Sequence, residues 1–261
     1  MSSSTPTQPT PRILLISACS KDKEPTHDRG AATLDTTPRR KLLQKHPDQV
    51  RAAAKLYTGY EHGQVKEAYN EFCKFADVDW KIISDGFGLI DHETDLVPYE
   101  CTLRRQANNK ADYKKRADRL GIETAGLTIA ELIAAIGSAK SIPEDLGQID
   151  LRSYDAVYIT LGKHYLRAIQ PVLESLSAAT PVYVFASRNH QSLTGGATVI
   201  PASERERRHI GAMQTRLKGI LLKNLAKSID NTTDLYDVCS TPIEVYARAI
   251  LGSNDVNNAE I

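Results

Sequence analysis

The sequence lacks any segment suited to a membrane. No apolar run approaches the roughly 20 residues that a membrane-spanning helix needs. Residues 1–11 are rich in Ser, Thr and Pro, and they lack the basic start and long apolar core of a signal peptide. We therefore expect a disordered tail over 1–11 and a soluble, cytoplasmic protein that has no membrane partner.

The sequence also has few cysteines and none of the common hydrolase or metal motifs. Its four cysteines form no CxxC pair, which argues against a zinc site and against a disulfide framework. HExxH, DxDxDG and an ordered Ser-His-Asp set are missing as well. We expect reduced thiols, no metal and no cofactor.

The chain also carries almost no net charge, because its 33 basic and 32 acidic residues add up to a net charge of +1. Bulk electrostatics would not bring such a chain to DNA, so only the distribution of charge can indicate that partner. Hydrophobic residues make up 41% and charged residues 25% of the 261, as in ordinary globular proteins. We expect one α/β catalytic domain over 12–251, followed by a flexible tail over 252–261.

Four apolar runs rich in β-branched residues predict strands, and helical patterns separate them. This alternation is typical of βαβ units and predicts a mainly parallel sheet of about four to five strands, with helices on both faces. In such sheets, ligands bind beyond the carboxyl ends of the strands. We expect the polar loops after the strands to meet at one edge as the site. The strands are predicted at 12–17, 80–84, 154–161 and 181–187, and the loops at 19–23, 85–88, 162–165 and 187–196.

The charges are sorted into blocks along the chain. The predicted helices 102–120 and 203–226 are strongly basic, whereas residues 77–100 are strongly acidic. Clustered Lys and Arg bind a polyanion through counterion release, although solvated helix faces would show the same pattern. The residues expected to hold a DNA backbone are Lys21, Lys23, Arg104, Arg105, Arg205, Arg207 and Arg208.

The acidic block supplies the candidate catalytic carboxylates. Asp85 directly follows a predicted strand and is flanked by two glycines, which allow a ligand to approach the backbone closely. A carboxylate there could orient water or face the positive charge that develops on a deoxyribose as its glycosidic bond breaks. Asp91 and Glu100 are the second choices. The alternative for each is a structural role such as capping a turn.

Other polar and aromatic residues are candidates for holding a base or sugar. Phe87 and Tyr99 could stack on an extruded base, because every base offers a π-face, although either could be plain core. His190 could donate to a departing base, since the pKa of histidine lies near neutrality. The remaining candidates for base or sugar binding are Cys19, Ser20, Gly88, Asn189 and Ser192.

Three segments, taken in order, resemble a bacterial and phage family related to the YaaA-like proteins. They read ISACSKDK (16–23), AAKLYTG (53–59) and WKIISDGFGLIDHETDLVPYE (80–100). The family carries C-S-x-x-K, then A-x-x-L-Y, then S-A-x-Y-G-L-(L/I) before P-Y-(D/E). The resemblance covers about 12–103, with a looser match through LGKHY (161–165). By resemblance, the family's motif positions fall on Cys19, Ser20, Lys21, Tyr57, Gly88, Tyr99 and Glu100.

The chain departs from that family at two positions, with Asp85 where Ala is usual and Phe87 where Tyr is common. The resemblance implies DNA binding and base-modification chemistry, since some proteins of this kind look like DNA glycosylases that act on phage DNA. We expect a glycosylase, serving antiviral defence, that excises a modified base such as glucosylated hydroxymethylcytosine from duplex DNA and leaves an abasic site. The alternatives are a non-catalytic DNA-binding stress protein and an enzyme of free nucleosides or nucleotides.

Overall fold

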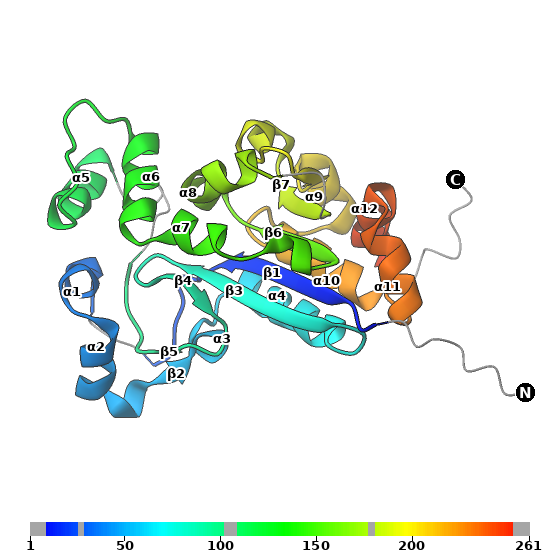
Figure 1. The fold of residues 1–261 in the computed structure, drawn as a ribbon, viewed down its shortest axis with the longest axis horizontal. Coiled ribbons are helices and arrows are strands. Elements are labelled where there is room, and N and C mark those ends of the chain that lie inside the picture. The colour runs from blue at the N-terminus through cyan, green and yellow to red at the C-terminus, as the bar shows by residue number, and fades with distance from the viewer. Residues whose placement is uncertain (1–8, 26–28, 102–108, 177–180, 253–261) are drawn as a thin grey trace, which may run out of the picture.

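In the computed structural model, a six-stranded sheet lies at the centre of the chain (Figure 1). The structure describes residues 9–25, 29–101, 109–176 and 181–252. Across the sheet the strand order is β4-β3-β1-β6-β7-β8; all neighbours are parallel except β4, which runs antiparallel to β3. The predicted α/β class and mainly parallel sheet are confirmed. The strands are β1 (Arg12–Ala18), β3 (Asp77–Ser84), β4 (Gly88–Asp91), β6 (Ala156–Thr160), β7 (Val182–Ala186) and β8 (Thr198–Pro201).

The sheet has two strands more than the four located from the sequence. One is β4, a short strand antiparallel to β3, and the other is β8; among the described residues β4 pairs only with β3 and β8 only with β7. Both are edge strands of four residues, and such strands bury one side only. Their sequences therefore lack the continuous apolar run by which buried strands are recognised.

The chain changes direction across the sheet between β1 and β6. From β1 it passes to β3 on one side, and it later returns to the other side of β1 to form β6, β7 and β8. Connections that leave neighbouring strands in opposite directions open a crevice at the carboxyl ends of those strands. The fold therefore places a crevice beyond the ends of β1 and β6.

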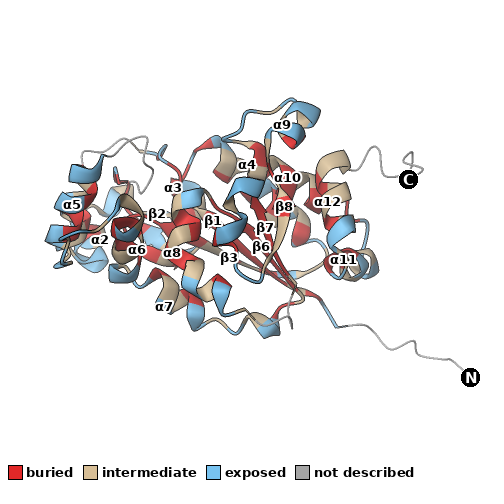
Figure 2. Cartoon of the chain, turned by 90° about the horizontal axis from the view of Figure 1, so that it is seen from above, coloured by how far each residue is buried: buried red, intermediate tan, exposed pale blue. Residues whose placement is uncertain are grey.

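Helices cover both faces of the sheet, as predicted, and Figure 2 shows the strands between the two layers. Residues alternate along β1, so that Ile13 and Leu15 pack in one core whereas Leu14 and Ile16 pack in the other. The first core holds helices α4 (Tyr60–Phe72), α10 (Leu217–Lys227), α11 (Thr232–Cys239) and α12 (Pro242–Leu251), and the second holds α5 (Lys110–Arg119), α6 (Ile129–Ala139), α7 (Ile142–Gly147) and α8 (Lys163–Glu174).

Short elements complete the described structure. A two-stranded sheet pairs β2 (Arg51–Ala52) with β5 (Asp95–Leu96), near one end of the molecule. The remaining elements are α1 (Ala31–Thr36), α2 (Arg39–Lys45), η1 (Pro47–Gln49), α3 (Ala53–Leu56), η3 (Leu151–Ser153), η4 (Arg188–Leu193) and α9 (Glu204–Ile210).

The predicted helix over 203–226 is two helices, so that prediction was wrong. Helix α9 ends at Gly211, which adopts φ 70° as its C-cap, and α10 begins at Leu217. Glycine enters this left-handed region without the steric cost that other residues meet, and it commonly ends a helix in this way. The loop 211–216 that results lies between the two helices and reaches the site described below.

The predicted helix over 102–120 is observed only from Lys110 onward, as α5. Arg104 and Arg105 lie outside the described residues. At the N-terminus, Pro11 is buried and its carbonyl accepts a hydrogen bond from the Asp77 amide at 2.8 Å. Within the part of the chain that the structure describes, no helix is both long and apolar enough to cross a membrane.

Candidate functional site

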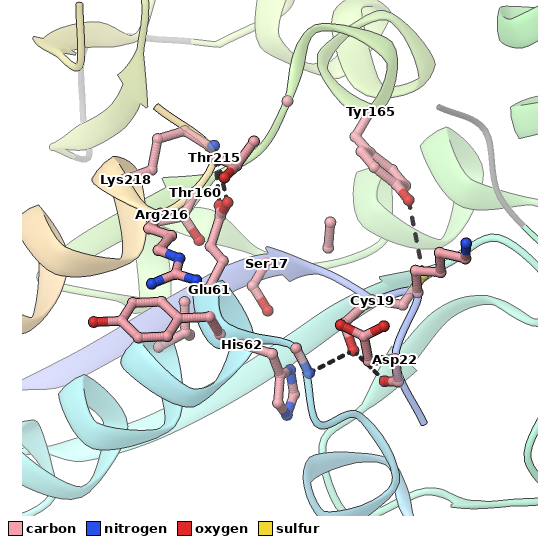
Figure 3. A pocket seen from close by; sticks show the side chains of 17 residues that line it. Ser17, Cys19, Asp22, Glu61, His62, Thr160, Tyr165, Thr215, Arg216 and Lys218 are labelled. Carbon is pink, nitrogen blue, oxygen red and sulfur yellow. Dashed lines mark hydrogen bonds and ion pairs between the residues drawn. The ribbon is translucent and has the colours of Figure 1, made fainter. Parts of the chain in front are cut away.

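A cavity of about 230 Å³ opens at the carboxyl ends of β1 and β6. We call it the β1–β6 cavity. Its walls come from the loop after β1, the first turn of α4, the start of α8 and the loop before α10 (Figure 3). The cavity therefore occupies the crevice that the reversal of strand order creates. The lining residues that matter below are Ser20, Lys21, Glu61, Thr160, Gly162 and Arg216.

A second cavity, of about 280 Å³, adjoins the first at the ends of β6 and β7. We call it the β6–β7 cavity. The two cavities have Glu61, Thr215 and Lys218 in common, so together they form one cleft. The residues that line only the second cavity include Leu161, His164, Ala186, Ser187, His190 and Gln214.

An ion pair stands where the two cavities meet. Lys218 Nζ lies 3.0 Å from Glu61 Oε1 and 3.2 Å from Oε2, and both side chains are largely buried. The close approach of α10 to α4 brings these residues together. It depends on Gly219, where a Cβ atom would lie only 2.9 Å from the Glu61 carbonyl oxygen. The cleft thus holds a carboxylate at its centre, and a lysine fixes the orientation of that carboxylate.

The mouth of the β1–β6 cavity carries an aromatic side chain and a cation. The Arg216 guanidinium lies 4.1 Å from the centre of the Tyr60 ring, which is a cation–π geometry. Tyr60 is among the most exposed large hydrophobic residues in the described chain, at 47%. The pair therefore leaves part of an aromatic face accessible beside a positive charge.

The loop after β1 is tied to the start of α4. Ser20 Oγ donates to the Asp22 carbonyl at 2.7 Å and accepts from the Gly59 amide at 3.1 Å. A Cβ atom at Gly59 would lie 2.6 Å from Ser20 Cβ, so this close approach requires glycine. Ser20 and Gly59 both belong to the motifs quoted for the family resemblance, and here they shape one wall of the cavity.

Several residues singled out from the sequence form a buried network, of which Cys19 and Tyr165 line the β1–β6 cavity whereas Asp85 lies behind them. Asp85 is 2% exposed, and its Oδ2 accepts from the Tyr165 hydroxyl at 2.8 Å. The same hydroxyl lies 3.8 Å from Cys19 Sγ. Burial, together with the charge of Asp85, raises the pKa of Cys19 to about 11, so the thiol stays protonated at neutral pH. This network supports the floor of the cleft.

A neighbouring cluster buries Tyr99, Tyr57 and Lys23. The Tyr99 hydroxyl hydrogen-bonds with Tyr57 and with Ser84, each at 2.7 Å. Lys23 Nζ lies 4.3 Å from the centre of the Tyr99 ring and donates to the Ser20 carbonyl at 2.8 Å. Tyr99 and Lys23 are thus engaged inside the protein, whereas Lys21 is exposed and lines the β1–β6 cavity.

The other two candidate carboxylates lie away from the cleft. Asp91 is on β4, where it pairs with Lys81 at 2.8 Å, and its other oxygen lies 3.1 Å from His92 Nδ1. Glu100 has an exposed side chain, and its amide donates to the Arg29 carbonyl at 2.7 Å. Neither residue lines the two cavities. The structure therefore does not bring Asp85, Asp91 and Glu100 together in one pocket.

Of the candidates in the loops after β3 and β7, His190 lines one of the two cavities and the others line neither. The Phe87 ring packs edge-on against Tyr99 with centroids 5.2 Å apart, and Gly88 needs its φ of 79° where the chain passes Lys140. Asn189 and Ser192 are exposed, and neither lines either cavity. His190 does line the β6–β7 cavity.

His190 has a pKa below its usual value of 6.5. Burial disfavours its cation, and the charges of Lys163, Lys218 and Arg167 lower the pKa further. The ring is therefore mainly neutral at neutral pH, and it acts as a hydrogen-bonding group with no net charge. Of these three cations only Lys218 lines the two cavities, and it is paired with Glu61.

Much of the basic block on α9 and α10 is already neutralised. Glu204 binds Arg207, with its oxygen 2.6 Å from Nε, and Arg208, at 2.9 Å. On α10, Lys223 and Lys227 lie 3.8 and 3.5 Å from Glu67 of α4. Arg205 is exposed on α9.

Some of the basic residues on α5 also form ion pairs within the protein. Arg116 and Arg119 lie 3.3 and 3.2 Å from the buried carboxylate of Asp35, which Lys140 also contacts at 3.0 Å. Helices α5 and α9 lie far apart in both Figure 1 and Figure 2. The two helices therefore do not form one continuous basic surface.

Reasoning from the sequence missed Glu61 and Thr160, and it placed Arg216 and Lys218 only within the basic block of the predicted helix 203–226. The only local signal for Glu61 is its place two residues after Gly59, at the beginning of a helix. Within the described residues, no group of three or more His, Cys, Asp or Glu side chains could hold a metal ion.

Comparison with protein-family models, with curated proteins and with solved structures finds no match to this chain. The resemblance to YaaA-like proteins therefore stays a prediction.

Proposed function

We propose that the protein hydrolyses the N-glycosidic bond of a nucleotide unit, and that it acts as a DNA glycosylase on DNA that carries a modified base, such as glucosylated hydroxymethylcytosine. The observation that carries this proposal is the position of Glu61. Its carboxylate stands at the centre of a cleft, between two cavities, with Lys218 Nζ 3.0 Å away. Cations lie around that carboxylate, which is the arrangement expected where an enzyme holds a phosphorylated sugar and works on its anomeric carbon.

The chemistry assigned to Glu61 is that of a general base. As the bond between the anomeric carbon and the base nitrogen breaks, its electron pair leaves with the base and positive charge develops on the sugar. The Glu61 carboxylate faces that charge and accepts a proton from water, whose oxygen forms the new bond to carbon. The departing base gains a proton from solvent. Water is the only co-reactant that this balance needs.

Lys218 and His190 are assigned supporting parts in this reaction. Lys218 holds both oxygens of Glu61 at 3.0 and 3.2 Å, and so limits the directions in which the carboxylate can point. His190 lines the β6–β7 cavity, where its neutral ring can hydrogen-bond a base or leaving group. Preorganised groups of this kind lower the barrier because they need no reorientation during the reaction.

The assay that tests the proposal is base release from DNA. DNA with unmodified, hydroxymethylated or glucosylated cytosine is incubated with the full chain; released bases are measured by mass spectrometry and abasic sites by alkaline cleavage. Glu61→Gln should slow release by about 10²- to 10⁴-fold, the usual contribution of a general base. Glu67→Gln is the matched control, since Glu67 is on the same helix and in an ion pair but outside both cavities. Intact strands with every substrate would refute the proposal.

A second candidate function is an enzyme of free nucleosides or nucleotides. It is favoured by the pairing of Arg207 and Arg208 with Glu204, which leaves less positive charge for a DNA backbone. The double variant Arg205→Glu, Arg208→Glu separates the two functions, because both side chains are exposed. Loss of base release from DNA at unchanged melting temperature supports the glycosylase. Unchanged activity on a nucleoside monophosphate, with no activity on DNA in either protein, supports the second candidate.

A further inference from the structure

We infer that the β1–β6 cavity is a phosphate subsite, built around the hydroxyl of Thr160. Thr160 ends β6 and is 1% exposed, yet it lines the cavity (Figure 3). Its Oγ1 has no hydrogen-bond partner among the described residues. Buried hydroxyl groups in folded proteins nearly always have a partner, so an unpaired one at the floor of a cavity indicates a ligand that supplies it.

The N-termini of two helices lie at the same cavity as this hydroxyl. Helices α4 and α8 both begin at the cavity, at Gly59 and Gly162, and neither glycine has a side chain that could cap the helix. The first amides of a helix lack partners within it, and the helix dipole places partial positive charge there. Helix N-termini are therefore sites where phosphate groups bind.

Two cations stand at the same cavity. Lys21 is exposed on the loop after β1, and Arg216 is held across the cavity by its stacking on Tyr60. The carboxylates that also line the cavity are Asp22, which is exposed, and Glu61, which Lys218 neutralises. The charges of the side chains that line the β1–β6 cavity therefore favour an anionic ligand. Phosphate suits the cavity because each oxygen can accept from a hydroxyl, an amide or a guanidinium.

The position of Glu61 then orients the substrate. Glu61 lies between the phosphate subsite and the β6–β7 cavity, since it lines both cavities. A nucleotide bound along the cleft has its phosphate at Thr160, its sugar at Glu61 and its base beside His190. This order rests on the proposed function, whereas the phosphate subsite stands on Thr160, the two helix ends and the cations alone. The phosphate itself comes either from a DNA backbone or from a free nucleotide.

Titration of the full chain with inorganic phosphate, by calorimetry and by ³¹P NMR, tests the subsite. Thr160→Val removes the hydroxyl at nearly constant volume, and we expect it to weaken phosphate binding about tenfold, the usual effect of one hydrogen bond to a charged group. Thr198→Val is the control, because Thr198 is a strand threonine outside both cavities. The melting temperature without phosphate should not fall in Thr160→Val, since the native hydroxyl has no partner to lose among the residues that the structure describes.

Arg216→Gln provides a second variant in case Thr160→Val does not fold, and it should also weaken binding. No saturable phosphate binding, or equal affinity in the wild type, Thr160→Val and Arg216→Gln, overturns the subsite. Competition identifies the source: displacement by a short oligonucleotide alone indicates a DNA phosphodiester, and displacement by a nucleoside 5′-monophosphate alone indicates a free nucleotide. Phosphate binding without base release leaves the subsite standing and refutes only the proposed function. Base release by a protein that does not bind phosphate supports the proposed function and refutes the phosphate subsite.

Discussion

The Tyr165 hydroxyl donates to Asp85 Oδ2 at 2.8 Å and so links the start of α8 to the end of β3 beneath the cleft. The Asp85 main chain is held too, because its carbonyl accepts from Cys101 Sγ at 3.6 Å and from Arg116. A carboxylate that is 2% exposed and bound in this way fixes the position of the chain around it. Asp85 thus supports the wall of the cleft from below, whereas Glu61 stands within the cleft.

Removal of this hydrogen bond should affect stability more than chemistry. Tyr165→Phe leaves the ring in place but takes a donor from a buried carboxylate, so we expect the free energy of unfolding to fall by about 1–3 kcal/mol. Urea unfolding measures the change. Tyr236→Phe is the control, since its hydroxyl bonds the Pro9 carbonyl in an exposed position, and less than about 1 kcal/mol should be lost there. Equal stability of Tyr165→Phe and the wild type would contradict this role.

Asp35 should be one of the most sensitive charged positions. Its buried carboxylate meets Arg116, Arg119 and Lys140 at 3.0–3.3 Å, so Asp35→Asn leaves the buried Arg116 without its counter-charge. Breaking a buried ion pair from one side costs about 3–5 kcal/mol of stability. The same change at Asp150, which pairs with Arg152 at the surface, should cost far less, because solvent screens an exposed ion pair. Chemical denaturation of both variants distinguishes the two sites, and equal losses would count against the buried network.

The framework of the fold was predictable because the inner strands are buried on both faces. All five residues of β6 and all five of β7 are buried, so their sequences are the uninterrupted apolar runs AVYIT and VYVFA. Their parallel pairing places the loops that follow them at one edge, as predicted. The location of the cleft at that edge could therefore be inferred from the sequence.

The residues within the cleft could not be predicted in the same way. Lys218 meets Glu61 across 157 positions of sequence, and this contact exists only because Gly219 lets α10 approach α4. The break at Gly211 that brings Arg216 to the cavity interrupts a pattern that otherwise reads as one helix. The glycines near Asp85 suggested that a ligand could approach the backbone there. At Gly88, however, the missing side chain makes room for the Lys140 carbonyl. Such contacts arise only from tertiary packing.

Gly219→Ala should disturb both stability and function. The added methyl would lie 2.9 Å from the Glu61 carbonyl oxygen and 3.0 Å from Gln64 Cβ, so α10 must move away from α4 and take Lys218 with it. We expect a loss of about 1–3 kcal/mol of stability and slower base release. Gly63→Ala, on α4 with open space around its Cβ position, should instead gain up to about 1 kcal/mol. Unchanged stability in Gly219→Ala would show that the helices tolerate a wider spacing.

His62 should make the fold sensitive to acid. Burial lowers its pKa from 6.5 to about 4, so between these values the unfolded chain binds a proton that the folded chain does not. Stability attributable to His62 is therefore complete above about pH 6.5 and is lost as the pH falls towards 4, by about 3 kcal/mol in all. Urea midpoints measured from pH 7 to pH 4 test this, and His62→Gln should reduce the slope. An identical slope in the variant would exclude His62 as the cause.

The cleft joins two helical layers that pack on opposite sides of the sheet. Glu61 belongs to α4, whose apolar face lies in one core, and Tyr165 belongs to α8, whose apolar face lies in the other. Each wall can therefore acquire substitutions that leave the opposite layer undisturbed, so evolution can tune the two walls separately. An occupant that touches both walls would brace the two layers against each other, and slower amide exchange should then appear in α4 and α8 together.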